Sequence, residues 1–412
     1  LPAPKRAEFL LCLVLIVGIL PVSVLADGTE KPVLDVSRSK TATALTSDWT
    51  SEVTLSLPSA EEKLESDVVF VLDKSTSAAL EEKALKLLTD LKAHVEEKGA
   101  KVKVGVVIFN KIATVTAQLT DLSTGYDTIK TAIETTITSG TNTHAGLLAG
   151  KQLLDADKAV PANRKYLVFV SDGVTYQFCQ DDDYNKAYTR SFAGSLHPDN
   201  VNQCGTMSEL NVQYGSVANN GIPMSDISTW LNNITSRIGT ANDNSDWDYE
   251  YTGYAPADNS KLLQSKEDVS NVEKALYLTK SLYESMQKSG YRCYSVLAKE
   301  TYPWGTAFMN MLAGGSTVDF DDIKNNILYA VDEGSTVVDT MGEKFDFGGL
   351  KTMTLTVGGT ELSRTIDGTT AYFGGDATNY RFMVEYDSAD DKFTWTINEN
   401  VSNFAPVKLT YT

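Results

Sequence analysis

Three runs of mostly apolar residues constrain the fold of this chain more than any other sequence feature. They are VVFVL at 68–72, VKVGVVIF at 102–109 and YLVFV at 166–170. A strand that is apolar at nearly every position is buried on both faces, as in a parallel sheet covered by helices. Apolar residues at helical spacing follow in the segments 81–98, 145–154 and 269–289. This alternation predicts an α/β fold, with a doubly wound sheet and helices on both of its faces.

The remaining segments complete this pattern. Residues 112–119 alternate between apolar and polar side chains, which predicts an antiparallel edge strand. A further strand is expected at 291–298, and helices are expected at 126–137, 306–312 and 321–331. Residues 176–262 are rich in Asn, Asp, Ser and Tyr, and so long a structureless loop is improbable inside a domain. We therefore predict that 176–262 is a folded insertion, or arm.

Segments on both sides of the α/β region alternate in the manner of antiparallel strands. They comprise 33–58 before it and four stretches after Phe345. We divide the chain into a leader at 1–26, an N-terminal β segment at 27–63, the α/β domain at 64–335 and a C-terminal β-domain at 336–412. The chain starts at Leu1 and stops after the strand-like KLTYT, so we interpret it as a fragment whose β-domain is truncated.

The leader has the pattern of a secretory signal peptide. Lys5 and Arg6 precede the apolar run from Phe9 to Leu20, and Ala26 offers a small residue before a cut at Asp27. A membrane anchor is the alternative, but a spanning helix needs about 20 apolar residues. No later stretch is apolar enough to span a bilayer. We expect a secreted protein whose mature chain has no transmembrane span.

Secretion permits disulfides. Cys12 leaves with the leader, and Cys179 and Cys204 flank one polar loop, which makes them the candidate disulfide. Cys293 lies in an apolar run and is expected to be a buried free thiol.

The formal net charge of −18 argues against nucleic-acid binding, because such a surface repels phosphate backbones. It also argues against docking on anionic lipid. A nucleophile elbow, a phosphate loop and a dinucleotide fingerprint are all missing from the sequence. We do not expect an enzyme.

Polar oxygens stand where two of the buried strands end. Asp73-Lys74-Ser75-Thr76-Ser77 follows the first strand, and Asp172 follows the strand at 166–170. Thr141 precedes the helix expected at 145–154. Ligands bind at the carboxyl ends of the strands in sheets of this kind. Carboxylate and hydroxyl oxygens are the ligands that a hard cation such as Mg²⁺ prefers.

These residues resemble the metal-ion-dependent adhesion site (MIDAS) of von Willebrand factor type A (VWA) domains. That family has an Asp-x-Ser-x-Ser motif, a distant Thr and an Asp after a later strand; the matching positions here are Asp73, Ser75, Ser77, Thr141 and Asp172. The resemblance implies that the three hydroxyls touch the metal directly or through water, and that the two aspartates support them. Thr141 is chosen over Thr143 because the family threonine lies three residues before the position of His144. The resemblance covers about 67–331, with the arm as an insertion.

The wider layout resembles the tip adhesins of Gram-positive pili. It implies a sandwich-like β-domain assembled from segments on both sides of the VWA domain, and attachment to a pilus or cell wall. Such β-domains often carry an isopeptide crosslink from a lysine to an Asn or Asp. Lys40 is the candidate lysine, its partner is open, and a solvated surface lysine is the alternative.

The function implied is a secreted or cell-surface adhesin. It would bind a protein ligand, such as a host matrix protein, through Mg²⁺ (or Mn²⁺ or Ca²⁺), with a ligand carboxylate completing the coordination. The alternative is a structural surface or pilus module whose metal only stabilises the fold. Ser75 and Ser77 could also merely cap the next helix, but capping would not explain Thr141 and Asp172.

Overall fold

The computed structural model describes residues 37–60, 64–74, 79–98, 100–137, 141–175, 177–179, 182–189, 249–252, 255–256, 271–301, 303–315 and 319–412. All of them belong to one structural unit, Val36–Thr412. The predicted leader and most of the predicted arm lie outside the described residues.

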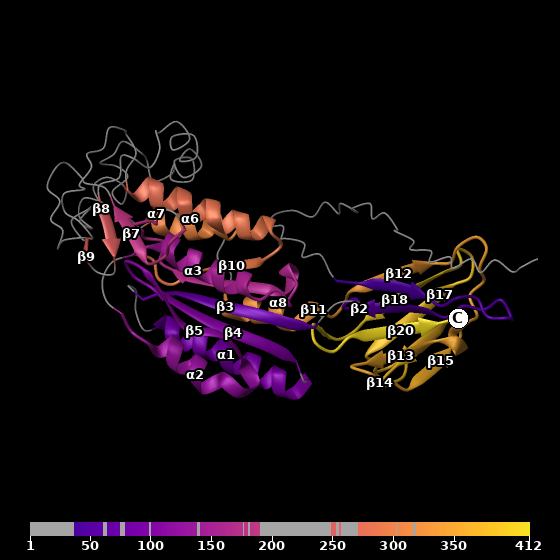
Figure 1. The fold of residues 1–412 in the computed structure, drawn as a ribbon. Helices are drawn as coiled ribbons and strands as arrows, with labels where there is room; N and C mark the ends of the chain where they lie inside the picture. The colour runs from indigo at the N-terminus through magenta and orange to yellow at the C-terminus, as the bar shows by residue number, and fades with distance from the viewer. Residues whose placement is uncertain are drawn as a thin grey trace, which may run out of the picture. The chain divides into compact units, whose positions relative to one another are not determined.

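A five-stranded sheet forms the centre of the α/β domain, in the order β10-β6-β3-β4-β5 (Figure 1). The strands are β3 (Glu65–Asp73), β4 (Lys101–Phe109), β5 (Ala113–Asp121), β6 (Lys165–Ser171) and β10 (Arg292–Leu297). β10, β6, β3 and β4 pair in parallel, and β5 pairs antiparallel to β4 at the edge. The three apolar runs are therefore the three inner strands, as predicted.

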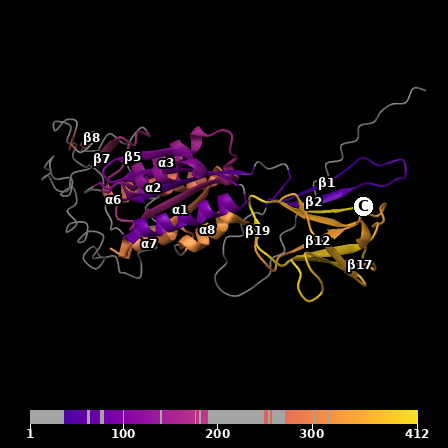
Figure 2. The same ribbon diagram turned by 90° about the horizontal axis from the view of Figure 1, so that it is seen from below.

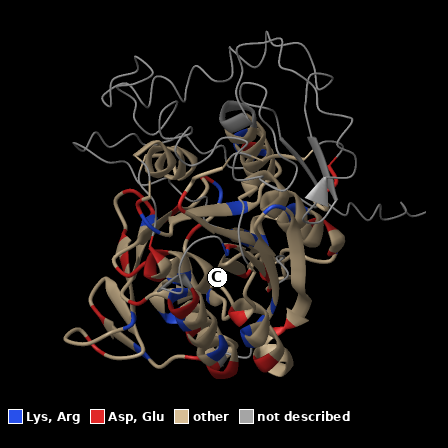
Figure 3. Ribbon diagram, turned by 90° about the vertical axis from the view of Figure 1, so that its left-hand side faces the viewer, with Lys and Arg blue, Asp and Glu red and all other residues tan. Residues whose placement is uncertain are grey.

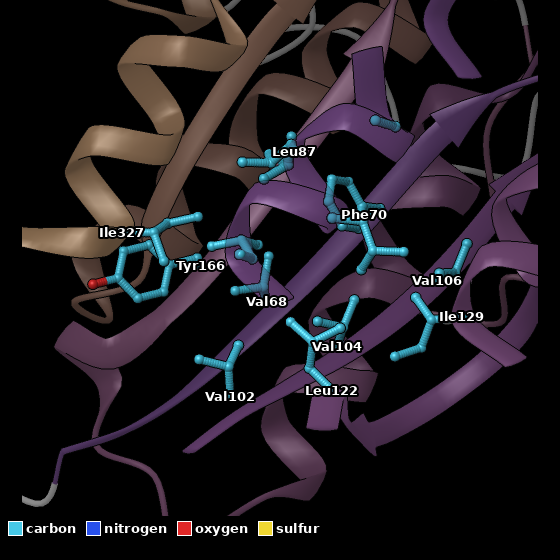
Figure 4. Packing of buried hydrophobic residues seen from close by; sticks show 14 of the residues in the cluster. Val68, Phe70, Leu87, Val102, Val104, Val106, Leu122, Ile129, Tyr166 and Ile327 are labelled. Atoms are coloured by element: carbon cyan, nitrogen blue, oxygen red, sulfur yellow. The ribbon is translucent and has the colours of Figure 1, made fainter. Parts of the chain in front are cut away.

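Helices cover both faces of this sheet (Figure 1). One face carries α1 (Ala79–Lys98), α2 (Leu122–Glu134) and α8 (Phe320–Leu328), and the other carries α3 (Thr143–Ala156), α6 (Asn271–Lys288) and α7 (Pro303–Leu312). Side chains along a strand point alternately to its two faces. Val68 and Phe70 accordingly join the core under α1 and α2 (Figure 4), and Val69 and Val71 join the core under α3. The predicted doubly wound fold is confirmed.

Helix α3 approaches the sheet through two glycines. A Cβ on Gly146 would lie 2.5 Å from the Phe109 ring, and a Cβ on Gly150 would lie 2.7 Å from Val71. Larger side chains would push the helix outward, because cores are close-packed. Glycine therefore allows the first turn of α3 to lie against Phe109, the residue that pairs with Asp73 across β4 and β3.

The helix predicted at 321–331 ends earlier than expected. α8 stops at Leu328, and Tyr329–Val331 forms the strand β11, which pairs antiparallel with β19 (Val401–Ser402). The aromatic and β-branched residues of YAV suit a strand, and the partner strand that decides the outcome lies far along the chain. α8 lies beside α1 (Figure 2), where Lys86 and Asp321 form an ion pair of 3.3 Å.

Two five-stranded antiparallel sheets make up the β-domain, in the orders β1-β2-β20-β13-β14 and β12-β18-β17-β16-β15. The first contains β1 (Ser39–Ala42), β2 (Val53–Leu57), β13 (Thr354–Val357), β14 (Thr360–Glu361) and β20 (Val407–Tyr411). The second contains β12 (Thr336–Thr340), β15 (Arg364–Asp367), β16 (Thr370–Phe373), β17 (Phe382–Asp387) and β18 (Lys392–Ile397). Leu55 and Leu57 share one core with Phe382 and Trp395. The predicted assembly of the β-domain from segments on both sides of the α/β domain is confirmed.

Short elements complete the described structure. Two 3-10 turns span Ala162–Arg164 and Leu350–Thr352. In the predicted arm, β7 (Lys186–Thr189), β8 (Tyr249–Thr252) and β9 (Ala255–Pro256) form a three-stranded antiparallel sheet.

Acidic and basic residues are interspersed on the helices of the α/β domain (Figure 3). Lys86 pairs with Asp90, and Lys130 pairs with Glu134, each one helical turn apart. Within the described part of the chain, no helix is both long and apolar enough to cross a membrane.

An aspartate is buried at the start of β3. Asp67 is fully buried, and its register partners are Lys103 on β4 and Lys165 on β6. Neither carboxyl oxygen has a hydrogen-bond partner in the described structure. Burial, followed by the nearby charge of Asp157, raises the pKa of Asp67 to about 6, although both lysines act in the opposite direction.

We predict that Asp67→Asn stabilises the protein at neutral pH. An aspartate in an unfolded chain has a pKa of about 3.9, so between about pH 4 and 6 the folded protein keeps a proton that the unfolded chain has lost. The free energy of unfolding of the wild type should therefore fall through this window as pH rises. Urea unfolding should show the variant to be more stable by about 3 kcal/mol at pH 7.5 and the difference to vanish near pH 4. A difference that does not depend on pH would contradict the prediction.

Candidate metal centre

Asp73 lies at the carboxyl end of β3 and is only 2% exposed. The parallel register pairs Leu72 with Val170 on β6, so the next residues of both strands lie side by side. The Ser171 hydroxyl donates to Asp73 Oδ2 at 2.7 Å. This hydrogen bond fixes the Asp73 carboxylate at the end of the sheet.

Asp172 follows directly and is 5% exposed. Its Oδ1 accepts from the Val174 backbone N–H at 3.0 Å, and its Oδ2 accepts from the Thr301 hydroxyl at 2.7 Å. Burial raises the pKa of Asp172, and the bonds from Thr301 and Val174 lower it by less. The anionic form of Asp172 is thus only partly compensated by the hydrogen bonds that it accepts.

Two glycines bring the Asp172 loop against the first turn of α7. Gly173 has a φ of +75°, a conformation that favours glycine, and a Cβ there would lie 2.2 Å from the Gly305 carbonyl oxygen. A Cβ on Gly305 would lie 2.6 Å from the Asp172 carbonyl oxygen. This close approach of two backbones holds Thr301 within reach of Asp172.

Thr141 lies just before α3 and is 6% exposed. Asn142 caps the helix, since its Oδ1 accepts from the Ala145 N–H at 2.9 Å, and its Nδ2 donates to the Lys111 carbonyl at 2.9 Å.

Thr143 has a different environment from Thr141, because its hydroxyl is fully buried and bonded to Thr175 at 3.0 Å and Thr279 at 2.8 Å. Thr143 is therefore occupied inside the core.

Two hydrogen bonds bring the three described loops together. Ser171 links the Asp73 loop to the strand that carries Asp172, and the Thr143–Thr175 bond links the Thr141 loop to the segment three residues after Asp172. Ser75 and Ser77 lie outside the described residues. Of the five predicted ligands, Asp73, Thr141 and Asp172 are thus carried by loops that meet at one end of the sheet.

Lys74, inside the Asp-x-Ser-x-Ser motif, is directed away from these carboxylates. Its ammonium forms an ion pair with Glu81 on α1 and donates to the Ile133 carbonyl at 2.5 Å. Since Glu81 balances its charge, Lys74 does not neutralise Asp73 or Asp172.

The donor set fits a hard divalent cation. Asp73, Asp172 and Thr141 supply carboxylate and hydroxyl oxygens, which Mg²⁺ prefers. In the part of the chain that is described, no three His, Cys, Asp or Glu side chains converge on a common point, so a site here depends on hydroxyls as well. A buried carboxylate with a raised pKa is also a group that a nearby cation would stabilise in its charged form.

Sequence reasoning missed two residues of this region. Ser171 carries a weak signal, because it is a small polar residue between an apolar run and Asp172. Thr301 carries no sequence signal. It lies 129 residues after Asp172 and reaches it only in the folded structure.

Among the described residues, neither Cys179 nor Cys293 is bonded to another cysteine. Cys179 is buried, which raises its thiol pKa to about 12, and it lies 3.5 Å from Asn142 Nδ2. Its backbone N–H donates to His144 Nδ1 at 3.1 Å. Cys204 lies outside the described residues, so the Cys179–Cys204 disulfide stays a prediction. Cys293 is partly buried on β10.

Lys40, the isopeptide candidate, lies on β1 with its side chain 46% exposed. Its ammonium is 2.6 Å from Asp339 Oδ1 on β12, and Asp339 Oδ2 accepts from the Tyr411 hydroxyl at 2.6 Å. The lysine therefore bridges strands that belong to different sheets. Its ammonium is paired with a carboxylate while nearly half of its side chain stays exposed, so the crosslink and the surface lysine both stay open.

Comparison with protein-family models gives one match. Residues 67–190 match the von Willebrand factor type A domain. This match and the sheet described above confirm the recognition made from the Asp-x-Ser-x-Ser motif, so this part of the chain is a VWA domain. No curated protein sequence matches the chain.

Several solved structures are similar to this chain at low sequence identity. The open conformation of the pilus adhesin SpaC from Lactobacillus rhamnosus GG is 15% identical, with a TM-score of 0.38, over 91% of this chain and 42% of that one. The vWF domain of the type V pili tip protein Mfa5 from Porphyromonas gingivalis is 15% identical, with a TM-score of 0.38, over 64% of this chain and 95% of that one. The pilus adhesin RrgA from Streptococcus pneumoniae is 14% identical, with a TM-score of 0.31, over 94% of this chain and 64% of that one. The chain thus spans less than half the length of SpaC.

The isopeptide prediction is tested by intact-mass spectrometry. An amide between Lys40 Nζ and Asp339 Cγ forms with loss of one water, so the crosslinked chain should be lighter than its sequence by one water. Lys40→Arg should restore the sequence mass, because the guanidinium keeps the charge but does not form the amide. A wild-type mass equal to the sequence mass would show that this crosslink does not form and that Lys40 and Asp339 are joined by the ion pair alone.

Proposed function

We propose that this chain, built around a VWA domain, is an adhesin that binds a protein ligand through a divalent metal ion. The metal would be Mg²⁺, or Mn²⁺ or Ca²⁺, held by Asp73, Ser75, Ser77, Thr141 and Asp172. The observation that carries the proposal is the pair of hydrogen bonds, Ser171–Asp73 and Thr143–Thr175, which ties the loops of three of these residues to one another.

The chain's own residues would prepare the site before a ligand arrives. Ser171 holds Asp73, while Thr301 and the Val174 N–H hold the two oxygens of Asp172. A carboxylate that is held in place loses little entropy when it begins to support a cation. When bound, the metal supplies positive charge and a coordination position that water can yield to a ligand carboxylate.

An acidic ligand is compatible with the net charge of −18. Repulsion between exposed charges is screened beyond about 8 Å at physiological salt. Close to the site, Lys74 is paired with Glu81 and the charge of Lys299 acts on Asp172, so the metal would add the positive charge that binds a ligand carboxylate. We therefore propose an acidic side chain of a protein, such as a host matrix protein, as the ligand group.

Secretion and cell-surface localisation belong to the same proposal. They are supported by the predicted signal peptide at 1–26, and attachment to a pilus or cell wall follows from the layout of the β-domain around the VWA domain. Non-enzymatic binding is proposed with them.

A structural surface module, whose metal only stabilises the fold, is the second candidate. The low exposure of Asp73 and Asp172 favours it, because buried carboxylates could hold a cation that no partner reaches. The two candidates differ in whether ligand binding depends on the metal.

We predict that Asp73→Ala abolishes metal binding without unfolding the chain. Isothermal titration calorimetry with Mg²⁺ or Mn²⁺ should show affinity lowered by about 100-fold or more, and circular dichroism should be unchanged. Asp67→Asn is the matched control, since it removes a buried carboxylate from the other end of the same strand and should keep wild-type affinity. Metal affinity retained by Asp73→Ala would refute the site.

We also predict that ligand binding requires the metal. On an array of extracellular matrix proteins, the wild type should bind at least one protein in Mg²⁺ and lose that signal in EDTA. Asp73→Ala should give no signal in either buffer, and Asp67→Asn should behave as the wild type. Binding that persists in EDTA would contradict the adhesin mechanism, and the absence of any metal-dependent signal would favour the structural module.

A further inference from the structure

We propose that Thr279 on α6 is a positioning residue for the candidate metal centre, acting through Thr143 and Thr175. The inference rests on the proposed function and extends it to a helix that carries none of the predicted ligands. Its basis is a chain of three buried threonine hydroxyls that joins α6 to two of the loops of the site.

The three hydroxyls are in direct contact. Thr143 Oγ1 donates to Thr175 Oγ1 at 3.0 Å and lies 2.8 Å from Thr279 Oγ1. Thr279 Oγ1 also lies 2.7 Å from the Ala275 carbonyl oxygen, one turn earlier on α6. All three threonines are fully buried.

A hydroxyl carries one proton, and Thr143 donates its own to Thr175. Thr279 is within donating distance of both the Ala275 carbonyl and Thr143 Oγ1, so it bonds to Thr143 only when its proton is not given to Ala275. The Ala275 carbonyl can release this proton, because it still accepts the backbone bond of α6. With the proton given to Thr143, removing the Thr279 hydroxyl takes away a bond to Thr143 and leaves the α6 backbone bonded.

Two members of the hydroxyl chain, its centre Thr143 and its end Thr175, lie close in sequence to predicted ligands. Thr143 is two residues after Thr141, and Thr175 is three residues after Asp172. Asn142, between Thr141 and Thr143, is itself bound to Lys111 and Ala145. A shift of Thr143 would therefore move Thr141 as well, because hydrogen bonds hold Asn142 between them in place.

A polar network in a core specifies one arrangement of its members, because each hydroxyl left without a partner costs free energy. Apolar side chains at these three positions would fill the space but would not dictate where Thr143 lies relative to Thr175. Metal ligands must be held within about 0.5 Å of their binding geometry. The threonine chain supplies that constraint from α6.

The test compares Thr279→Val with Thr279→Ser. Valine has nearly the shape of threonine without the hydroxyl, whereas serine keeps the hydroxyl and loses the methyl group. Calorimetry with MnCl₂ or MgCl₂ measures metal affinity, and thermal unfolding in EDTA measures the stability of the metal-free protein. Thr131→Val on α2 is the control, because Thr131 makes the same bond to a carbonyl one turn earlier, from Asp127, without contacting the site.

We expect Thr279→Val to bind the metal about tenfold more weakly, as seen when partners of metal ligands are removed. Thr279→Ser should stay within about threefold of the wild type, since it keeps the hydrogen bond on which affinity depends. Thr131→Val should match the wild type. A merely structural role would lower the unfolding temperature in EDTA for both substitutions and leave the metal affinity of Thr279→Val unchanged.

Thr175→Val is the second variant, and it removes the hydroxyl at the other end of the chain. It is used in place of Thr279→Val if Thr279→Val does not fold. It should weaken metal binding as well, and the double variant should lose less than the product of the two single losses. Wild-type affinity in both valine variants, with Asp73→Ala inactive, would overturn the inference alone. Absence of metal binding by the wild type would overturn the proposed function and the inference together.

Discussion

The parallel pairing of β3 with β6 is the constraint on which the candidate metal centre depends. Its register sets Leu72 opposite Val170, so both strands release their next residues at the same end of the sheet. The Ser171–Asp73 hydrogen bond exists only because of that register. A slip of one residue would also turn Val69 and Val71 from the core under α3 to the opposite face, so burial and site geometry are fixed by the same pairing.

The two ends of β3 handle buried negative charge differently. At the start of the strand, Asp67 lies between Lys103 and Lys165, and burial still raises its pKa to about 6. At the other end, Lys74 is occupied by Glu81, and Asp73 and Asp172 are held by hydroxyl and backbone N–H donors. Burying carboxylates in this way is costly unless a cation accompanies them. Lysines are thus the register partners of the carboxylate at the start of β3, whereas hydroxyl and backbone N–H groups hold the two carboxylates at the other end.

The β-domain depends on contacts between distant parts of the chain. β2 precedes the VWA domain and pairs with β20 after it, with Leu55 opposite Leu409. Lys40 and Asp339 are 299 residues apart and join the edges of the two sheets. The VWA domain is therefore inserted between two segments of the chain that must pair with each other to form the core of the β-domain. Such long-range pairing carries a large loop-closure cost, which the buried apolar core has to offset.

The sequence by itself determined the buried strands, the edge strand, the alternation with helices and the position of Asp73 and Asp172 at strand ends. It also determined the family, through the spacing of the Asp-x-Ser-x-Ser motif. These properties are local. The spacing of apolar residues that distinguishes a strand from a helix, and the residues at which each element ends, lie within short stretches of the sequence. Only the tertiary structure decided that Ser171 holds Asp73, that Thr301 holds Asp172, that Thr279 reaches Thr143 and that Lys40 meets Asp339. It also decided that α8 ends at Leu328, since β11 pairs with a strand some 70 residues later. Each of these outcomes depends on strand register and on how a helix is rotated against the sheet, and both are set by packing between segments far apart in the chain.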